Sequence, residues 1–90
     1  MHFEWNWAKA VANLAKHGIR FEEAATVFHD PLSATGADPD HSIDEERFVT
    51  IGVSTRGRLL LVAHTDEGDT IRIISARLAT AAEKGIYEEG

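Results

Sequence analysis

The first half of the chain places apolar residues at the three- and four-residue spacing of two short helices. Asn6 is a suitable N-cap before the first apolar stripe, and Gly18 suits the left-handed position that ends a helix. The second stripe stops at Asp30-Pro31, because proline disfavours helical backbone at the residue before it. The pattern therefore predicts two helices, each burying one apolar face. Their stripes are Trp7, Ala10, Val11 and Leu14 in the first helix, and Phe21, Ala24, Ala25 and Phe28 in the second.

The second half changes to the alternating pattern of β-strands. Residues 47–54 alternate in character, and residues 58–65 are apolar enough for a central strand. Gly57 and Gly68 lie in the turns that separate these strands from a third, β-branched segment. We therefore expect an antiparallel meander followed by a helix. The strands are 47–54, 58–65 and 70–76, with 32–37 as a weaker edge strand, and the helix is 77–88.

One face of this sheet is predicted to be apolar and to carry the two N-terminal helices. It consists of Val49, Ile51, Val53, Leu59, Leu61, Ala63, Ile74 and Ala76. Alternation places Arg47, Thr65 and Arg72 at one end of the same face. The fold class is α+β: two N-terminal helices packed on a three- to four-stranded antiparallel sheet, with a C-terminal helix, in a single domain of residues 1–90.

Two further arginines are predicted to meet on the other, mixed face. Turns at 55–57 and 66–69 place Arg58 directly opposite Arg77. Like charges in this position are unfavourable unless something compensates. A bound phosphate or carboxylate is one interpretation, and solvation or pairing with an acid of the tail such as Glu83 is the other.

Composition and charge narrow the function classes. The chain has 90 residues, no cysteine and a net charge of −6, so a disulfide framework, a cysteine-based zinc site and a cysteine nucleophile are excluded. No stretch approaches the ~20 apolar residues of a membrane helix, and the N-terminus lacks a signal-peptide pattern; we expect a cytoplasmic protein with no membrane partner. Residues 1–46 carry three basic and nine acidic groups, whereas residues 47–90 carry six of each. The overall charge argues against non-specific nucleic-acid binding but leaves room for a local cationic site in the second half.

The side chains available for catalysis are arginine, histidine and one tyrosine. No two histidines have metal-ligand spacing, the serines lack a nucleophile elbow, and no glycine-rich phosphate loop is present, so we expect no metal and no cofactor. His17 at the end of the first helix is either a cap alone or a cap with a catalytic role. This inventory suits metal-free RNA cleavage, because the 2′-hydroxyl is an internal nucleophile and arginine neutralises developing charge.

Several blocks of the sequence resemble the BrnT toxin family. The resemblance extends from Phe3 to Tyr87, and it is specific because the blocks occur together and in order. The blocks include Lys16-His17-Gly18, Phe21-Glu22-Glu23-Ala24, Asp30-Pro31, His41-Ser42, Glu45-Glu46-Arg47-Phe48 and Arg72-Ile73-Ile74-Ser75-Ala76-Arg77. Asp66-Glu67-Gly68 departs from the family, which often has an arginine before this glycine.

The resemblance implies a small cytoplasmic ribonuclease toxin with a RelE-like fold, which cleaves RNA and arrests translation. Its partner would be a BrnA-like ribbon-helix-helix antitoxin, through which alone it would contact operator DNA. At the positions that match the family, Arg47, Arg72 and Arg77 are expected to bind phosphate and stabilise charge. His17 and His41 are the candidates for proton transfer.

Two other interpretations remain open at this point. In one, the arginine-rich surface is a non-enzymatic module that docks an antitoxin or another acidic protein, and transcripts stay intact. In the other, the chain is a DNA-associated regulatory subunit; however, neither N-terminal helix supplies the basic recognition surface that such a subunit needs.

Overall fold

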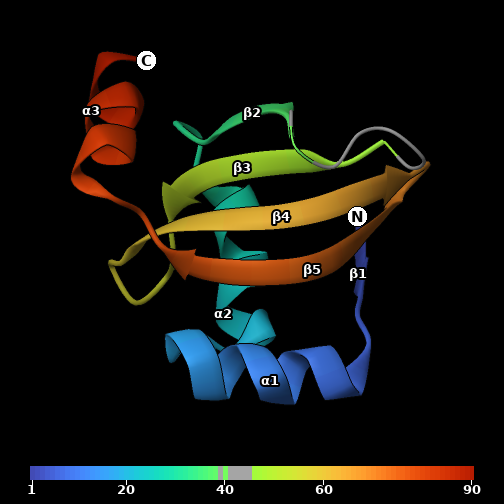
Figure 1. Cartoon of the computed structure of the whole chain (residues 1–90). Coiled ribbons are helices and arrows are strands. Elements are labelled where there is room, and N and C mark those ends of the chain that lie inside the picture. Colours follow the sequence, from blue (N-terminus) through green and yellow to red (C-terminus); the bar gives the residue numbers. More distant parts are fainter. Residues whose placement is uncertain (39, 41–45) are drawn as a thin grey trace.

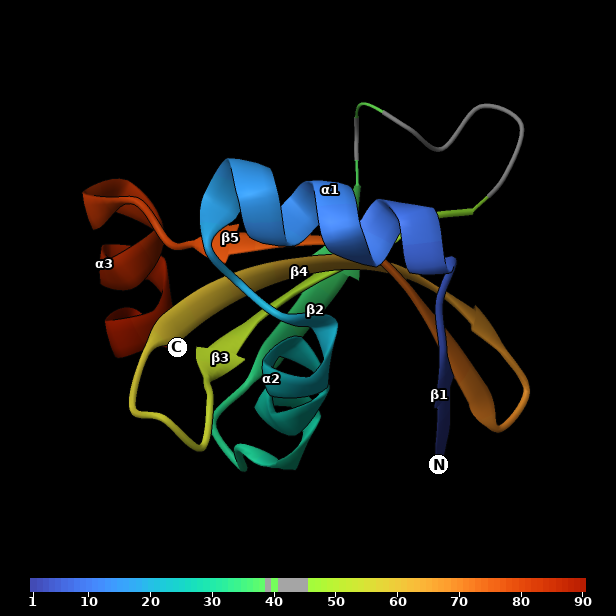
Figure 2. The ribbon, with the colours of Figure 1, turned by 90° about the horizontal axis from the view of Figure 1, so that it is seen from below.

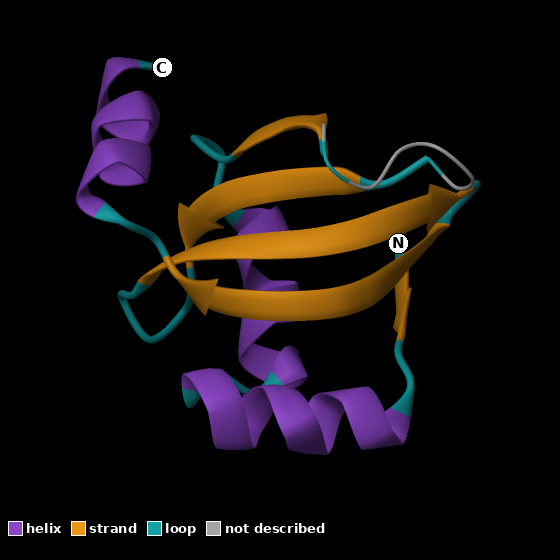
Figure 3. Ribbon diagram, viewed as in Figure 1, coloured by secondary structure: helices purple, strands orange, loops and turns teal. Residues whose placement is uncertain are grey.

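A computed structural model describes residues 1–38, 40 and 46–90 and shows three α-helices, one 3₁₀ turn and a five-stranded sheet (Figure 3). The strand order is β1-β5-β4-β3-β2; β1 is parallel to β5 and the other neighbours are antiparallel. The predicted α+β class is confirmed, but the sheet is mixed and has five strands instead of three to four. The elements are β1 (His2–Glu4), α1 (Trp7–His17), α2 (Phe21–Thr26), η1 (Val27–His29), β2 (Ala34–Ala37), β3 (Phe48–Val53), β4 (Leu59–Glu67), β5 (Thr70–Leu78) and α3 (Ala81–Glu89).

The two faces of the sheet have different surroundings. Figure 1 looks onto the face that we call the open face, and α2 lies behind the sheet on the covered face (Figure 1). Seen from below, α1 runs alongside β5, and α3 stands apart at one end of the molecule (Figure 2). The core lies where α2 and the segment that precedes it pack against the covered face of the sheet. Its buried residues are Ile19, Phe21, Ala24, Val27, Leu60, Val62, Ile71, Ile73 and Ala76.

Strand β1 was not predicted. It pairs His2 with Thr70 and Glu4 with Arg72, before the chain turns into α1. Phe3 anchors it by packing against Phe28 with a ring-centroid distance of 5.5 Å. Three residues are too few for an alternating pattern to stand out, so tertiary packing determines this strand.

The orientation of α1 differs from the predicted stripe. Trp7 is 77% exposed and Val11 is 48% exposed, whereas Asn13 is buried. The Asn13 amide donates to the carbonyl oxygens of Ile19 and Ala76, both at 2.9 Å, and accepts from Ala76 N at 3.0 Å. Because β1 covers only the first part of β5, the amide takes the place of a neighbouring strand at the otherwise unpaired edge. The hydrogen bonds of Asn13, and not the apolar stripe, therefore determine which side of α1 faces the sheet. Its predicted ends are confirmed: Asn6 Oδ1 accepts from Lys9 N, and Gly18 has φ of 71°.

The predicted register is confirmed in the first hairpin and wrong in the second. β3 and β4 pair with the expected offset, from Val53 opposite Leu59 along the ladder. β4 continues to Glu67, so the second turn has two residues, with Gly68 at φ of 60°. A further shift occurs farther along, because Ala63 pairs with Ser75 while His64 pairs with Ile73. This leaves Ile74 as an extra residue, a β-bulge, in β5.

The prediction of which face carries the helices was also wrong. Thr50, Leu60, Val62, His64, Ile71, Ile73 and Ala76 are the buried residues on the covered face. Val49, Ile51, Leu61 and Ala63 lie on the open face instead. Gly52 shows why the helical segment packs where it does, because a Cβ there would stand 2.8 Å from Val27 Cγ1 and 3.0 Å from Ser33 Cβ. The absence of a side chain lets η1 and the segment after it lie directly on the sheet.

The predicted C-terminal helix is present as α3, but it begins at Ala81 and not at residue 77, because β5 continues to Leu78; polar contacts hold it. Thr80 and Glu83 form a capping box, and no residue of α3 is buried. The Tyr87 hydroxyl donates to Asp30 Oδ2 at 2.6 Å, which lowers the pKa of Asp30 and raises that of Tyr87. Within the described part of the chain, no helix is both long and apolar enough to span a bilayer.

Candidate functional site

A groove of about 790 Å³ crosses the open face. Its floor is apolar and comes from β3 and β4, namely Val49, Ile51, Leu61 and Ala63. Strand β2 forms one wall, and Glu83 and Ile86 of α3 belong to another. The groove is much larger than a second pocket of about 130 Å³ between α1 and the start of α2, and its concave shape suits a ligand.

One end of the open face carries two of the three predicted arginines. Arg72 lies on β5 directly opposite Thr65, and Arg47 comes directly before β3. Continuing the β3–β4 register by one residue places Arg47 on the other side of Thr65. The expected row of Arg47, Thr65 and Arg72 is therefore present. The Arg72 side chain is 50% exposed and reaches Glu4 at 3.3 Å.

Arg77, the third predicted arginine, also lies on the open face and lines the groove. Its guanidinium donates to both carboxylate oxygens of Glu83, at 2.7 and 2.9 Å. These hydrogen bonds hold the pKa of Glu83 at about 2, well below the usual range of a carboxyl group. Arg72 and Arg77 are five residues apart along β5, or about 16 Å in an extended strand. A single phosphate cannot reach both, so the predicted arginine set occupies two separate positions.

The bulge at Ile74 is the reason that Arg72 and Arg77 share a face. Residues five apart in a regular strand point to opposite sides of the sheet, and alternation therefore predicted opposite faces for them. The extra residue reverses the alternation, so that Ser75 and Arg77 turn to the side of Arg72. Nothing in the sequence pattern alone marks this bulge.

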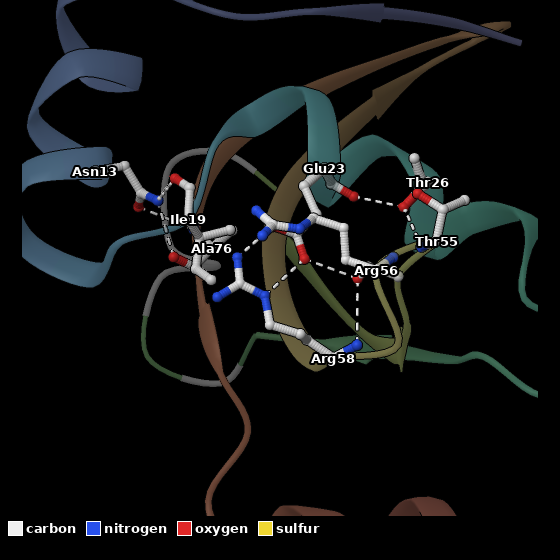
Figure 4. A network of polar contacts seen from close by, with 9 residues as sticks. Asn13, Ile19, Glu23, Thr26, Thr55, Arg56, Arg58 and Ala76 are labelled. Carbon is white, nitrogen blue, oxygen red and sulfur yellow. Dashed lines mark hydrogen bonds and ion pairs between the residues drawn. The ribbon is translucent and has the colours of Figure 1, made fainter.

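Arg58 does not face Arg77, contrary to the sequence prediction. It forms a bidentate pair with Glu23 of α2, in which Arg58 Nε donates to Glu23 Oε2 at 2.9 Å and the terminal nitrogen bonds Oε1 (Figure 4). Ser54 Oγ also donates to Glu23 Oε2 at 2.7 Å. The Arg58 hydrogen bonds lower the pKa of Glu23 and hold its buried carboxylate ionised. The prediction was wrong because the register of the second hairpin differs from the expected one, so that Arg77 pairs with Leu61 and not with Arg58.

The predicted histidines do not join the arginines in the described part of the structure. His17 lies in the last turn of α1, which packs beside β5 and not on the open face. Its position gives no support to a proton-transfer role in the groove. His41 lies outside the described residues.

His64, which the sequence analysis did not single out, belongs to a chain of hydrogen bonds. His64 Nδ1 lies 2.8 Å from Asp66 Oδ1, and Nε2 lies 2.7 Å from Thr50 Oγ1, which in turn is 2.7 Å from Thr35 Oγ1. Burial lowers the pKa of His64 despite the Asp66 carboxylate. A neutral ring that donates from Nδ1 and accepts at Nε2 satisfies every contact. Phe28 and Phe48 pack against the ring, so this chain belongs to the covered face.

The described residues contain no cluster of three or more His, Asp or Glu side chains that could hold a metal ion. What the open face offers is cationic hydrogen-bond donors at two positions with an apolar floor between them. Guanidinium groups bind phosphate oxygens in a bidentate manner and carry their charge at every working pH. An apolar floor suits the flat face of a base or an aliphatic side chain.

Comparisons with known proteins agree with this architecture. Residues 5–83 match the model of a family described as the ribonuclease toxin BrnT of type II toxin–antitoxin systems. The crystal structure of the Brucella abortus ribonuclease toxin BrnT is similar, with a TM-score of 0.65 and 24% sequence identity over 89% of this chain and 97% of that chain. This likeness shows a shared fold. No curated protein sequence matches.

Proposed function

Because the chain belongs to the BrnT family, the ribonuclease toxins of type II toxin–antitoxin systems, we propose that the open face of its sheet is the RNA-binding and cleavage surface. The observation that carries this proposal is the bulge at Ile74, which places Arg77, a groove residue, on the same face of the sheet as Arg72. The covered face has no room for a substrate, since α2 and η1 occupy it.

The groove and the end of the open face that carries Arg47 and Arg72 have different parts in this proposal. Arg72 and Arg47 bind the phosphate at which cleavage occurs, since Arg72 is half exposed and has one long contact, to Glu4. The charge of Arg77 is already balanced by Glu83, so Arg77 orders α3 and contacts the substrate secondarily. The apolar floor between them receives part of a nucleoside.

The chemistry that these residues support is attack of the 2′-hydroxyl on the adjacent phosphorus, with release of the 5′-oxygen. The arginines stabilise negative charge that builds on the non-bridging oxygens, and no metal ion is required. One group takes the proton of the 2′-hydroxyl and another delivers a proton to the leaving oxygen. His41 stays the candidate for one of these transfers.

Family membership implies an antitoxin partner. We infer that the partner is a BrnA-like ribbon-helix-helix protein, that both act in the cytoplasm, and that operator DNA is reached through the antitoxin. In this interpretation RNA cleavage arrests translation until the antitoxin neutralises the toxin.

The decisive experiment compares Arg72→Ala with Arg20→Ala. Both arginines are exposed, but Arg20 precedes α2 on the helical side of the molecule. Loss of a charge-stabilising donor should reduce RNA cleavage by about 10²-fold in Arg72→Ala, while Arg20→Ala cleaves like the unchanged protein. Cleavage is measured on purified protein with a chelator present, together with the melting temperature, which neither substitution should lower by more than a few degrees.

A cellular arm separates this function from a purely binding role. Induced expression in a bacterial host that lacks a matching antitoxin should arrest growth and fragment RNA, and Arg72→Ala should relieve both effects. Growth arrest with intact RNA would favour the non-enzymatic binding module. Equal cleavage by Arg72→Ala and the unchanged protein would remove the open face from the proposal.

A further inference from the structure

We propose that the Thr65 hydroxyl is a phosphate ligand, and that together with Arg72 and Arg47 it forms an anion subsite at one end of the open face. This inference rests on the proposed function, which it deepens by naming a neutral donor beneath the two arginines. It starts from a buried hydroxyl group without a hydrogen-bond partner, and not from charge.

Thr65 is 4% exposed, and its Oγ1 atom is buried without a hydrogen-bond partner among the described residues. A buried hydroxyl without a partner is destabilising by about 1–3 kcal/mol relative to a satisfied one. No other buried side-chain nitrogen or oxygen of the described residues is in this state. Valine would fill the same position in a strand with higher β-propensity and without that cost, so folding alone does not explain the hydroxyl.

The surroundings of Thr65 identify what would complete its hydrogen bonding. Arg72 stands directly opposite on β5, and the continued register places Arg47 on the β3 side. A cationic neighbour on each side favours an anion over water or a neutral acceptor. A phosphate oxygen accepts from guanidinium and hydroxyl donors alike, whereas the two guanidinium groups would repel a cation.

The Arg72 side chain is the group that moves to admit a phosphate in this proposal. Its side chain is half exposed and its contact with Glu4, at 3.3 Å between side chains that are each about half exposed, is a weak surface pair. In the proposal this side chain moves outward, and a phosphate bound by its guanidinium accepts from the Thr65 hydroxyl. The register shift that the bulge causes falls between Ala63 and His64 of β4, next to Thr65. Bulges of this kind re-aim side chains beside functional sites.

Thr50 supplies a matched control. It is a threonine on the neighbouring strand β3 and is 0% exposed. Its hydroxyl, unlike that of Thr65, has two partners, Thr35 Oγ1 and His64 Nε2, each at 2.7 Å. The same substitution to valine therefore removes an unused hydroxyl at one position and a fully used one at the other.

The experiment measures melting temperatures in chloride and in inorganic phosphate at equal ionic strength, for the unchanged protein, Thr65→Val, Thr65→Ser and Thr50→Val. The unchanged protein should melt higher in phosphate, and binding of phosphate should be about tenfold weaker in Thr65→Val. In chloride, Thr65→Val should melt at the same temperature or higher. Thr65→Ser should keep the phosphate effect. Thr50→Val should melt lower in both salts and keep the difference between them.

Three results would overturn the subsite: no phosphate effect in the unchanged protein, a full phosphate effect in Thr65→Val, or a fall in the chloride melting temperature of Thr65→Val as large as that of Thr50→Val. The last would mean that the hydroxyl supports the fold. The outcome is independent of RNA cleavage. A phosphate effect that depends on Thr65 in a protein that leaves RNA intact would refute the proposed function and keep the subsite. RNA cleavage by a protein whose phosphate effect is absent or does not depend on Thr65 would refute the subsite and keep the proposed function.

Discussion

The two faces of the sheet satisfy their polar groups in different ways. On the covered side, Asn13, the Glu23–Arg58 pair and the Thr50–His64–Asp66 chain are networks in which the buried side-chain nitrogen and oxygen atoms have partners inside the protein. On the open side, Thr65 has no partner among the described residues and Arg72 has one weak one. Stability therefore depends on the covered side, whereas the capacity to bind a ligand remains on the open side.

The most severe test of this division is Asn13→Ala. The substitution leaves two carbonyl groups and one N–H of the backbone without partners where α1 meets the edge of β5. We expect a loss of about 3 kcal/mol in the free energy of unfolding, which for a domain of this size lowers the melting temperature by about 15 °C. Thermal and denaturant unfolding measure both quantities.

Asn6→Ala is the control on the same helix. It removes one exposed capping hydrogen bond, from Lys9 N, and should cost about 1 kcal/mol. If Asn13→Ala cost no more than Asn6→Ala, the buried network would not be a principal source of stability, and the contrast between the two faces would fail.

The second test compares two glycines on adjacent strands. In Gly52→Ala the new Cβ would stand 2.8 Å from Val27 Cγ1 and 3.3 Å from Asp30 Oδ2 on the covered face. Gly36 pairs with Val49 on the open face, and a Cβ there meets nothing within 4 Å. Neither glycine has a positive φ, so the comparison isolates packing.

We expect Gly52→Ala to lower the free energy of unfolding by about 2 kcal/mol through overpacking, and Gly36→Ala to change it by less than about 0.5 kcal/mol. Urea unfolding at one pH measures both. Equal losses would indicate that β2 and β3 are equally constrained, and that the open face is no more tolerant than the covered one.

The sequence predicts the positions of most elements and the register of the first hairpin, because turn glycines, caps and alternation act locally. It does not predict the faces correctly. The single extra residue Ile74 reverses the alternation of the last strand, and its effect appears only against the partner strand β4. As a consequence, Arg77 moves to the face of Arg72, and the predicted meeting of Arg77 with Arg58 is lost.

Hydrogen bonds between residues far apart in the sequence account for the remaining differences between the predicted and the observed structure. The apolar stripe of α1 suggested that Trp7 is buried, but the bond between Asn13 and a strand 63 residues away rotates the helix. Likewise, Glu23 and Arg58 are 35 residues apart and no short motif connects them. Such pairs become visible only when the chain is folded, since spacing within one element contains no information about them.

The third and smallest test addresses Arg77, an arginine of the open face that is paired with a carboxylate, like Arg58 on the covered side. Its bonds to Glu83 hold the pKa of that carboxyl at about 2, below the usual value of 4.5. A carboxyl whose pKa is lowered by folding stabilises the protein above pH 4.5, and this contribution is lost as the pH falls from 4.5 towards 2. Because both side chains are partly exposed to solvent, at 39% and 23%, we expect a contribution of only about 1 kcal/mol.

In Glu83→Gln the free energy of unfolding should therefore fall by about 1 kcal/mol less over this pH range than in the unchanged protein. Glu88→Gln, which removes another acidic group of α3 but no contact of Arg77, is the control variant. Acid titrations of the unfolding free energy measure the difference. If Glu83→Gln left the pH dependence as it is, Glu83 would not hold Arg77 in solution. Arg77 would then be as available to a ligand as Arg72, and the open face would present a binding arginine at two positions.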